Sequence, residues 1–97
     1  MSRLTLEQVK FNLGKIPGWK LDDQQMALSR TFVCEDFRSV IRLINQVAEY
    51  LEQDYQHLEM RIVGHSITFT LSTKEAKGLT GKDFALAQLV NKLTQSA

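Results

Sequence analysis

The fold is decided by residues 67–93, which read ITFTLSTKEAKGLTGKDFALAQLVNKL. The first six positions alternate apolar and hydroxyl side chains, the period of a strand with one buried face. The polar loop at 73–78 breaks this alternation and closes with Gly78, which suits a backbone turn with positive φ. Thr80 stands where a helix N-cap is expected, with Asp83 three residues later to share the free backbone donors. Apolar residues at helical spacing then predict a core-facing stripe of Leu86, Leu89, Val90 and Leu93.

A first helix is expected close to the N-terminus. Thr5 precedes it as the cap, and Gln8 is placed to return a hydrogen bond to the cap backbone. Gly14 is positioned to end the helix. The face expected to be buried carries Leu6, Val9 and Leu13.

Two short strands should follow this helix. Residues 16–18, Ile-Pro-Gly, predict a turn, and residues 19–21 are a short strand candidate. A second strand is predicted from about 27 to 33. Its alternation is imperfect, because Arg30 falls between two apolar residues on the face expected to be buried.

The longest amphipathic pattern spans residues 35–53, without glycine or proline. Apolar side chains recur at helical spacing and predict one buried stripe made of Phe37, Val40, Ile41, Ile44, Val47, Ala48 and Leu51. The opposite side carries Arg38, Arg42, Asn45, Glu49 and Glu52. A third strand is expected from Leu58, with Leu58, Met60 and Ile62 on one face, and a tight turn at 64–66 leads to the strand that starts at Ile67.

The predicted order is therefore helix, two strands, helix, two strands, helix. Two hairpins without a parallel crossover favour an α+β fold, in which a four-stranded antiparallel sheet is covered on one face by three helices. No repeat or linker divides the 97 residues. We therefore expect a single domain over residues 1–97.

Composition excludes several classes of protein. A formal net charge of +1 provides no field that would draw nucleic acid or an acidic membrane to the chain. Hydrophobic residues make up 43% of the sequence, enough for a packed core, and no apolar run is long enough to span a membrane. The single cysteine, Cys34, cannot form an internal disulfide. Together with the lack of a secretory leader, this predicts a cytoplasmic protein.

The same deciding stretch carries a family resemblance. Thr73-Lys74, Gly78-Leu79-Thr80 and Asp83 followed by Ala87 resemble the C-terminal signature of the pterin-4a-carbinolamine dehydratase family, written Thr-His, Gly-Leu-Thr and Asp-x-x-x-Ala. The resemblance extends from about Ile16 to Leu93 and implies the same element order. It also implies a homodimer formed by pairing sheet edges, or a tetramer formed through helix packing.

The resemblance also implies where a catalytic site would lie. The family's signature of an acidic residue, three residues and His-His-Pro falls on Glu52 and on Gln56-His57-Leu58. The third family histidine becomes Lys74, and the downstream aspartate is Asp83. One of three histidines is therefore retained.

The substituted positions decide what chemistry is possible. Dehydration of a carbinolamine needs groups that take up and release protons near neutral pH, as histidine does. Gln56 does not titrate, and Lys74 is charged unless it is desolvated. For His57 a structural hydrogen bond is favoured over catalysis, and Asp83 is explained as an anion at a helix N-terminus.

The remaining candidates have simpler interpretations. His65 is expected to face solvent in a hairpin turn, and Cys34 is expected to be a small buried hydrophobe. The scattered histidines and cysteine lack the spacing of metal ligands, so neither a metal nor a cofactor is expected.

Two functions from different classes remain open. The first is a non-catalytic assembly factor for RuBisCO, resembling a site-degenerate branch of the family in bacteria with α-carboxysomes; its partner would be the RuBisCO large subunit and it could associate with the carboxysome. Candidate contact surfaces are the former pterin cleft around Gln56, His57 and Lys74, and the helix face with Arg38, Arg42 and Glu49. The alternative is an active 4a-hydroxytetrahydropterin dehydratase with an altered site that uses His57. A third role known in the family, transcriptional coactivation, is favoured by nothing in the sequence.

Overall fold

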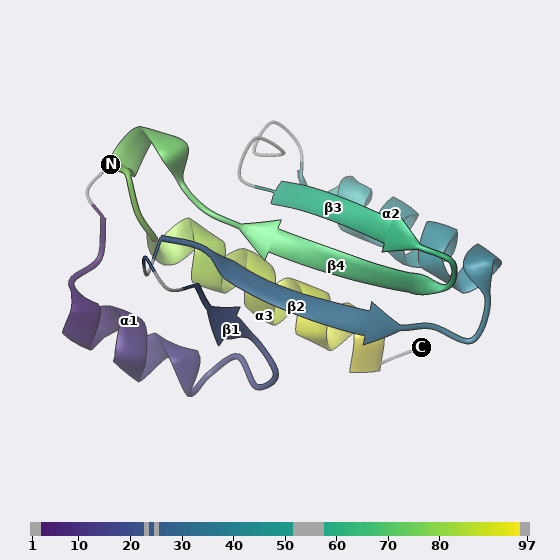
Figure 1. The fold of residues 1–97 in the computed structure, drawn as a ribbon, viewed down its shortest axis with the longest axis horizontal. Coiled ribbons are helices and arrows are strands. Elements are labelled where there is room, and N and C mark those ends of the chain that lie inside the picture. Colours follow the sequence, from purple (N-terminus) through teal and green to yellow (C-terminus); the bar gives the residue numbers. More distant parts are fainter. Residues whose placement is uncertain (1–2, 23, 25, 52–57, 96–97) are drawn as a thin grey trace.

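The computed structural model describes residues 3–22, 24, 26–51 and 58–95. The elements follow one another in the predicted order, with a short 3-10 turn, η2, added before the last helix (Figure 1). Their bounds are α1 (Leu6–Leu13), β1 (Lys20–Leu21), β2 (Leu28–Val33), α2 (Phe37–Leu51), β3 (Leu58–Val63), β4 (Ser66–Leu71), η2 (Lys74–Ala76) and α3 (Gly81–Gln95). The predicted α+β class is confirmed.

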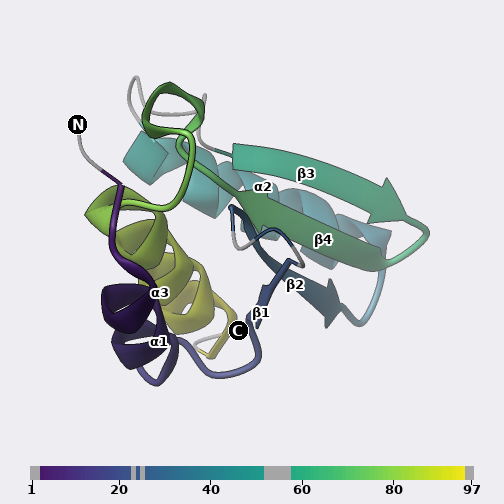
Figure 2. The ribbon, with the colours of Figure 1, turned by 60° about the vertical axis from the view of Figure 1, so that its left-hand side comes forward.

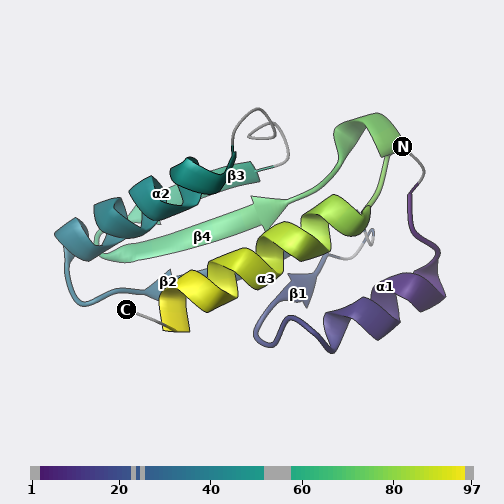
Figure 3. The same cartoon turned by 180° about the vertical axis from the view of Figure 1, so that it is seen from behind.

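The four strands form one antiparallel sheet in the order β1-β2-β4-β3. The register places Phe69 of β4 between Arg30 of β2 and Met60 of β3. The alternation predicted for β4 is confirmed, because Ile67, Phe69 and Leu71 are fully buried. Viewed from behind, α2 and α3 cover one face of the sheet (Figure 3), and α1 lies alongside α3 (Figure 2).

The predicted capping of α1 is confirmed in both directions. The Gln8 amide N–H donates to the Thr5 hydroxyl over 3.2 Å, and the Thr5 amide N–H donates to the Gln8 side-chain oxygen over 2.9 Å. Gly14 ends the helix, in a right-handed conformation. The expected apolar face is only partly correct: Val9 is buried, whereas Leu6 is 43% exposed.

The start of α2 is set by a side chain that the sequence pattern did not single out. The Ser39 amide N–H and hydroxyl both donate to Asp36 Oδ1 over 2.8 Å. These two hydrogen bonds, together with the nearby positive charge of Arg42, hold the pKa of Asp36 below its ordinary value. The helix therefore begins at Phe37, after the cap, instead of at residue 35.

Both long helices are rotated relative to the predicted stripes. In α2, Leu43 is buried while Phe37, Ile41 and Ala48 are exposed. The reason is that α2 packs against both α3 and β4, so the side of α2 that faces these two elements is buried. In α3 the fully or nearly buried positions are Asp83, Phe84, Ala87, Val90 and Asn91, and the predicted Leu86, Leu89 and Leu93 are half-buried at its flank.

The interruption at Arg30 is explained by a partly buried polar network. Its guanidinium carbon lies 4.4 Å from the centre of the Phe32 ring, and its Nη1 donates to the Pro17 carbonyl and to Asn91 Oδ1 over 2.7 Å each. The Trp19 indole N–H donates to the same Asn91 oxygen over 2.8 Å. Asn91 thus joins α3 to β2 and to the turn before β1.

Gly18 is required by this network. Its φ is +88°, a conformation that favours glycine. An added Cβ would lie 2.6 Å from the Arg30 guanidinium carbon. The turn predicted at 16–18 is therefore fixed by space as well as by local conformation.

No helix within the described ranges combines the length and apolar character needed to cross a membrane.

We expect Asn91→Ala to lower the free energy of unfolding by about 2–3 kcal/mol, because the buried Trp19 indole and the half-buried Arg30 guanidinium lose their acceptor. Asn45→Ala is the matched control, since Asn45 is exposed on α2 and surface changes usually stay within about 0.5 kcal/mol. Urea unfolding of both variants measures the difference. Equal stabilities of the two variants would contradict the structural role of Asn91.

Candidate functional site

The candidate site is built on the loop between β4 and α3. Thr73 and Gly78 form an isolated antiparallel bridge that closes the loop at its base, with the Thr73 amide donating to the Gly78 carbonyl over 3.2 Å. Between them lies η2, which is followed by Lys77 with φ 55°. The expectation of a positive φ at Gly78 is therefore wrong, because Lys77 makes that turn. Gly78 is instead constrained by the Arg3 side chain, whose Cβ would lie 3.2 Å from an added Cβ.

A buried carboxylate holds the loop to α3. Asp83 Oδ2 accepts hydrogen bonds from the Thr73 hydroxyl over 2.7 Å and from the Thr80 amide N–H over 2.9 Å. Asp83 has no exposed surface, and Thr73 and Thr80 are each 1% exposed. This carboxylate therefore fastens the start of the loop and the start of the helix to one point.

The proton positions in this cluster follow from the donor inventory. Thr73 has one hydroxyl proton, which it donates to Asp83, so the Thr80 hydroxyl donates to Thr73 across their 2.8 Å contact. The reciprocal cap predicted between Thr80 and Asp83 is thus half formed. Asp83 caps the Thr80 amide as expected, whereas the Thr80 side chain turns to Thr73.

The predicted site residues are only partly visible in the described structure. Lys74 opens η2 and is exposed; within the described part of the chain its ammonium group has no hydrogen-bond or ion-pair partner. Glu52, Gln56 and His57 lie outside the described residues. Leu58, which directly follows them, opens β3 and pairs with Leu71, the last residue of β4 before the loop.

Two other candidates lie away from the loop. His65 sits in the β3–β4 turn, at the opposite end of β4 from η2 (Figure 1). It is exposed, as predicted, and its Nδ1 lies 2.7 Å from the Cys34 carbonyl oxygen. Cys34 is a half-buried free thiol packed against the core. The described residues contain no group of three histidine, cysteine, aspartate or glutamate side chains that could hold a metal ion.

Among the described residues, the loop provides structure more clearly than acid–base chemistry. Asp83 is enclosed, and its Oδ2 already accepts two hydrogen bonds, so its role here is to position Thr73 and Thr80. Lys74 presents an exposed ammonium, which has three donors and no lone pair to accept a proton. Sequence patterns did not identify Thr73 as a partner of Asp83, because the pair is ten residues apart and belongs to no local capping pattern.

Comparison with known proteins identifies the architecture. The family model described as pterin 4 alpha carbinolamine dehydratase matches residues 2–93. The chain belongs to this family. A relative from Nocardia farcinica is 37% identical over 92 residues, covering 95% of each chain, and one from Thermomicrobium roseum is 37% identical over 93 residues, covering 96% of this chain and 98% of its own. Both are provisionally named pterin-4-alpha-carbinolamine dehydratases.

A solved relative supports the fold of this pterin dehydratase-like protein. The crystal structure of a transcriptional coactivator/pterin dehydratase from Brucella melitensis matches with a TM-score of 0.88 at 28% identity. The match covers 95% of this chain and 98% of the other. The two chains therefore share this fold over nearly their whole length.

We expect Asp83→Ala to lower the free energy of unfolding by about 2–4 kcal/mol, because the buried Thr73 hydroxyl and Thr80 amide lose a charged acceptor. Hydrogen exchange should show faster exchange of the Thr80 amide in this variant. Glu75→Ala, an exposed change in the same loop, is the control. Unchanged protection of the Thr80 amide would refute the fastening role of Asp83.

Proposed function

We propose that this protein is a non-catalytic member of the pterin dehydratase family that acts as an assembly factor for another protein. The observation that carries the proposal is the exposed Lys74 at the position where the family has a histidine. An exposed ammonium cannot act as the neutral base that dehydration requires. The hydrogen bonds from Thr73 and Thr80 to Asp83 hold the same loop in place. In this proposal the scaffold is kept while a proton-transfer position is replaced.

Exposed apolar surface supports a protein partner. Phe37 and Ile41 on α2 are 56% and 39% exposed, and Met60 and Ile62 on β3 are each 39% exposed. Met60 and Ile62 pair with Phe69 and Ile67, so they point to the sheet face that α2 only partly covers. Exposed apolar side chains that lie on adjacent elements are typical of interaction surfaces.

We further propose that the protein works as a homodimer through β3 and that its client is the RuBisCO large subunit in bacteria with α-carboxysomes. β3 is an edge strand of the described sheet, and its outer backbone groups offer a template for pairing with a second copy. The client proposal rests on the resemblance to the site-degenerate family branch. A factor of this kind stabilises an assembling subunit by binding it preferentially.

A second candidate is an active 4a-hydroxytetrahydropterin dehydratase that uses His57. It is favoured by the names of the relatives and by the hydrogen bond from Thr73 to Asp83, which holds the loop to α3. In this alternative His57 would transfer the proton and Lys74 would contribute only positive charge.

A turnover assay separates the two candidates. We expect the purified protein to leave the rate of 4a-hydroxytetrahydropterin dehydration at the uncatalysed level, because a missing acid or base typically costs about 10²–10⁴-fold. His57→Ala should then change nothing. A rate matching that of an active family member, lost in His57→Ala and kept in His65→Ala, would establish the second candidate instead.

Assembly is tested by disturbing the apolar surface. Ile62→Glu should convert the protein from twice its 11.1 kDa chain mass to a monomer in light scattering, because a charge on this face must be desolvated on association. Val33→Glu is the control, since Val33 is 72% exposed and lies on the opposite face of the sheet.

The same variants test the client. The wild type and Val33→Glu should retain the RuBisCO large subunit when the two are co-expressed, and Ile62→Glu should not. Failure of the dimeric wild type to bind the large subunit would remove RuBisCO as the client. A wild type that is monomeric would refute the proposed interface.

A further inference from the structure

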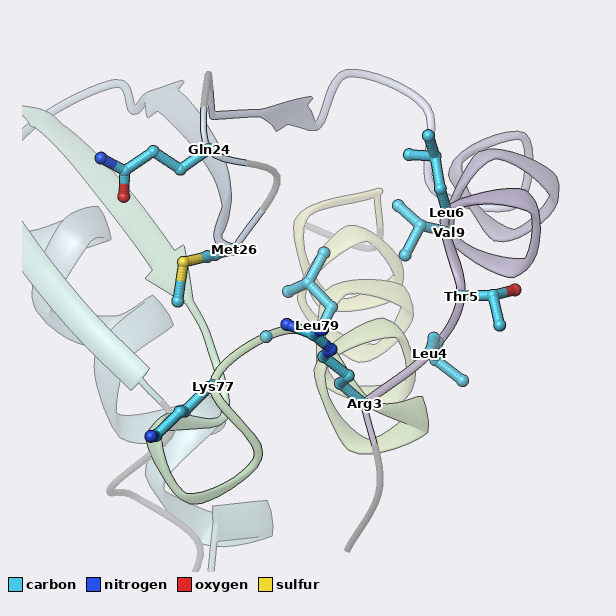
Figure 4. Close-up of a pocket in the computed structure, with 10 residues that line it drawn as sticks. Arg3, Leu4, Thr5, Leu6, Val9, Gln24, Met26, Lys77 and Leu79 are labelled. Atoms are coloured by element: carbon cyan, nitrogen blue, oxygen red, sulfur yellow. The ribbon is translucent and has the colours of Figure 1, made fainter.

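A hollow of about 410 Å³ lies between the N-terminal segment, α1 and the loop that carries η2 (Figure 4). Its wall also includes Gln24 and Met26, which lie between β1 and β2 in the sequence. It is lined by Arg3, Leu4, Thr5, Leu6, Val9, Gln24, Met26, Lys77, Gly78 and Leu79. Thr73, Lys74 and Asp83 are not among these residues, so the lining does not include the described residues of the candidate catalytic position.

Among the described residues, the charged side chains that line this hollow are those of Arg3 and Lys77, and both are cationic. Neither forms an ion pair within the described part of the chain. Two positive charges without such a partner at one concave surface favour the binding of an anionic group.

The fold places the stem of Arg3 and the backbone of Lys77 beside each other. The Arg3 stem packs over Gly78, where an added Cβ would lie 3.2 Å from both Cβ and Cδ of Arg3. The next residue is held as well, because the Leu4 amide donates to the Leu79 carbonyl over 2.7 Å. Lys77 projects from the left-handed turn that ends η2. Because Gly78 has no side chain, the Arg3 side chain can pack directly against the loop that carries Lys77.

Apolar side chains form the rest of the wall. Val9 and Leu79 are nearly buried beneath it, whereas Leu6 and Met26 are 43% and 39% exposed. In Figure 4, Met26 points from its segment toward the loop of Lys77. An apolar ligand body would cover the exposed surface of Leu6 and Met26, which is favourable in water.

We propose that this hollow binds a small organic acid, with the carboxylate between Arg3 and Lys77 and an apolar body against Leu6 and Met26. Its volume is within the range of about 300–1,000 Å³ found for small-molecule sites. Charge-assisted hydrogen bonds from guanidinium or ammonium to carboxylate provide the recognition. The proposal is independent of whether the protein is a dehydratase or an assembly factor.

The test compares two probes of similar shape, 2-naphthoate and the uncharged 2-naphthalenemethanol. Titration followed by backbone amide NMR of the full chain should give saturable shifts in residues 4–9, 26 and 77–79 with naphthoate. Naphthoate should bind more tightly than the alcohol. The difference should shrink as salt is added, because exposed charges are screened.

Charge-removing variants identify the cations. Lys77→Gln and Arg3→Gln should each weaken naphthoate binding by about two- to fivefold, the range expected for a partly exposed ion pair. Both variants should leave the binding of the alcohol unchanged. Lys20→Gln, an exposed cation on β1 that does not line the hollow, is the matched control and should bind both probes like the wild type.

A variant that fills the hollow tests whether the probes bind there. Met26→Trp should weaken the binding of both naphthoate and the alcohol, because the larger side chain would occupy the hollow. The proposal is overturned if naphthoate causes no saturable shifts around the hollow, or if it shifts only residues elsewhere. It is also overturned if acid and alcohol bind equally, or if Lys20→Gln weakens naphthoate as much as Lys77→Gln does. The dehydration and client assays do not enter this test, so their failure leaves it intact.

Discussion

Two buried polar side chains on one face of α3 hold the rest of the molecule in place. Asp83 and Asn91 are eight residues apart, and Ala87 lies midway between them, so the three share a helix face at i, i+4 and i+8. All three are buried. Asp83 binds the loop after β4, whereas Asn91 binds Arg30 on β2 and Trp19, which directly precedes β1. The helix therefore connects the two hairpins through hydrogen bonds as well as through apolar contact.

In this arrangement the residue that stabilises the loop, Asp83, is a different one from the residue at the candidate proton-transfer position, Lys74. Asp83 stabilises the loop whether or not the neighbouring position can transfer a proton, since its described hydrogen bonds go to Thr73 and to the Thr80 backbone. Lys74 lies in an exposed 3-10 turn and is no partner of a buried group in the described structure. A family member can thus change its acid–base residues at little cost to folding, and a fold-level match alone does not establish an activity.

The surface properties support two kinds of binding at separate places. The half-covered apolar face beside α2 and β3 is broad and suits a protein, whereas the hollow beside α1 is small, concave and positively charged. The loop that carries Lys74 also carries Lys77 and Gly78, so an occupant of the hollow would contact the segment that forms the candidate site.

The sequence by itself determined the elements, because their signals are local. The alternation of β4, the capping pair Thr5 and Gln8 and the long amphipathic pattern of α2 each arise from residues within a few positions of one another. Together with the family signature around Asp83, they were sufficient to predict an antiparallel sheet with three helices. The family resemblance further predicts that Lys74 stands where the family has a histidine.

Only the tertiary structure decided which faces are buried and which polar groups meet. Trp19 and Asn91 are separated by 72 residues, and Arg30 and Asn91 by 61, so no periodic pattern could pair them. The stripes of α2 and α3 are rotated because each helix packs into a corner made by another helix and the sheet. The left-handed turn falls on Lys77 and the close approach on Gly78 for the same reason: the space around a residue is set by chain segments that are distant in sequence.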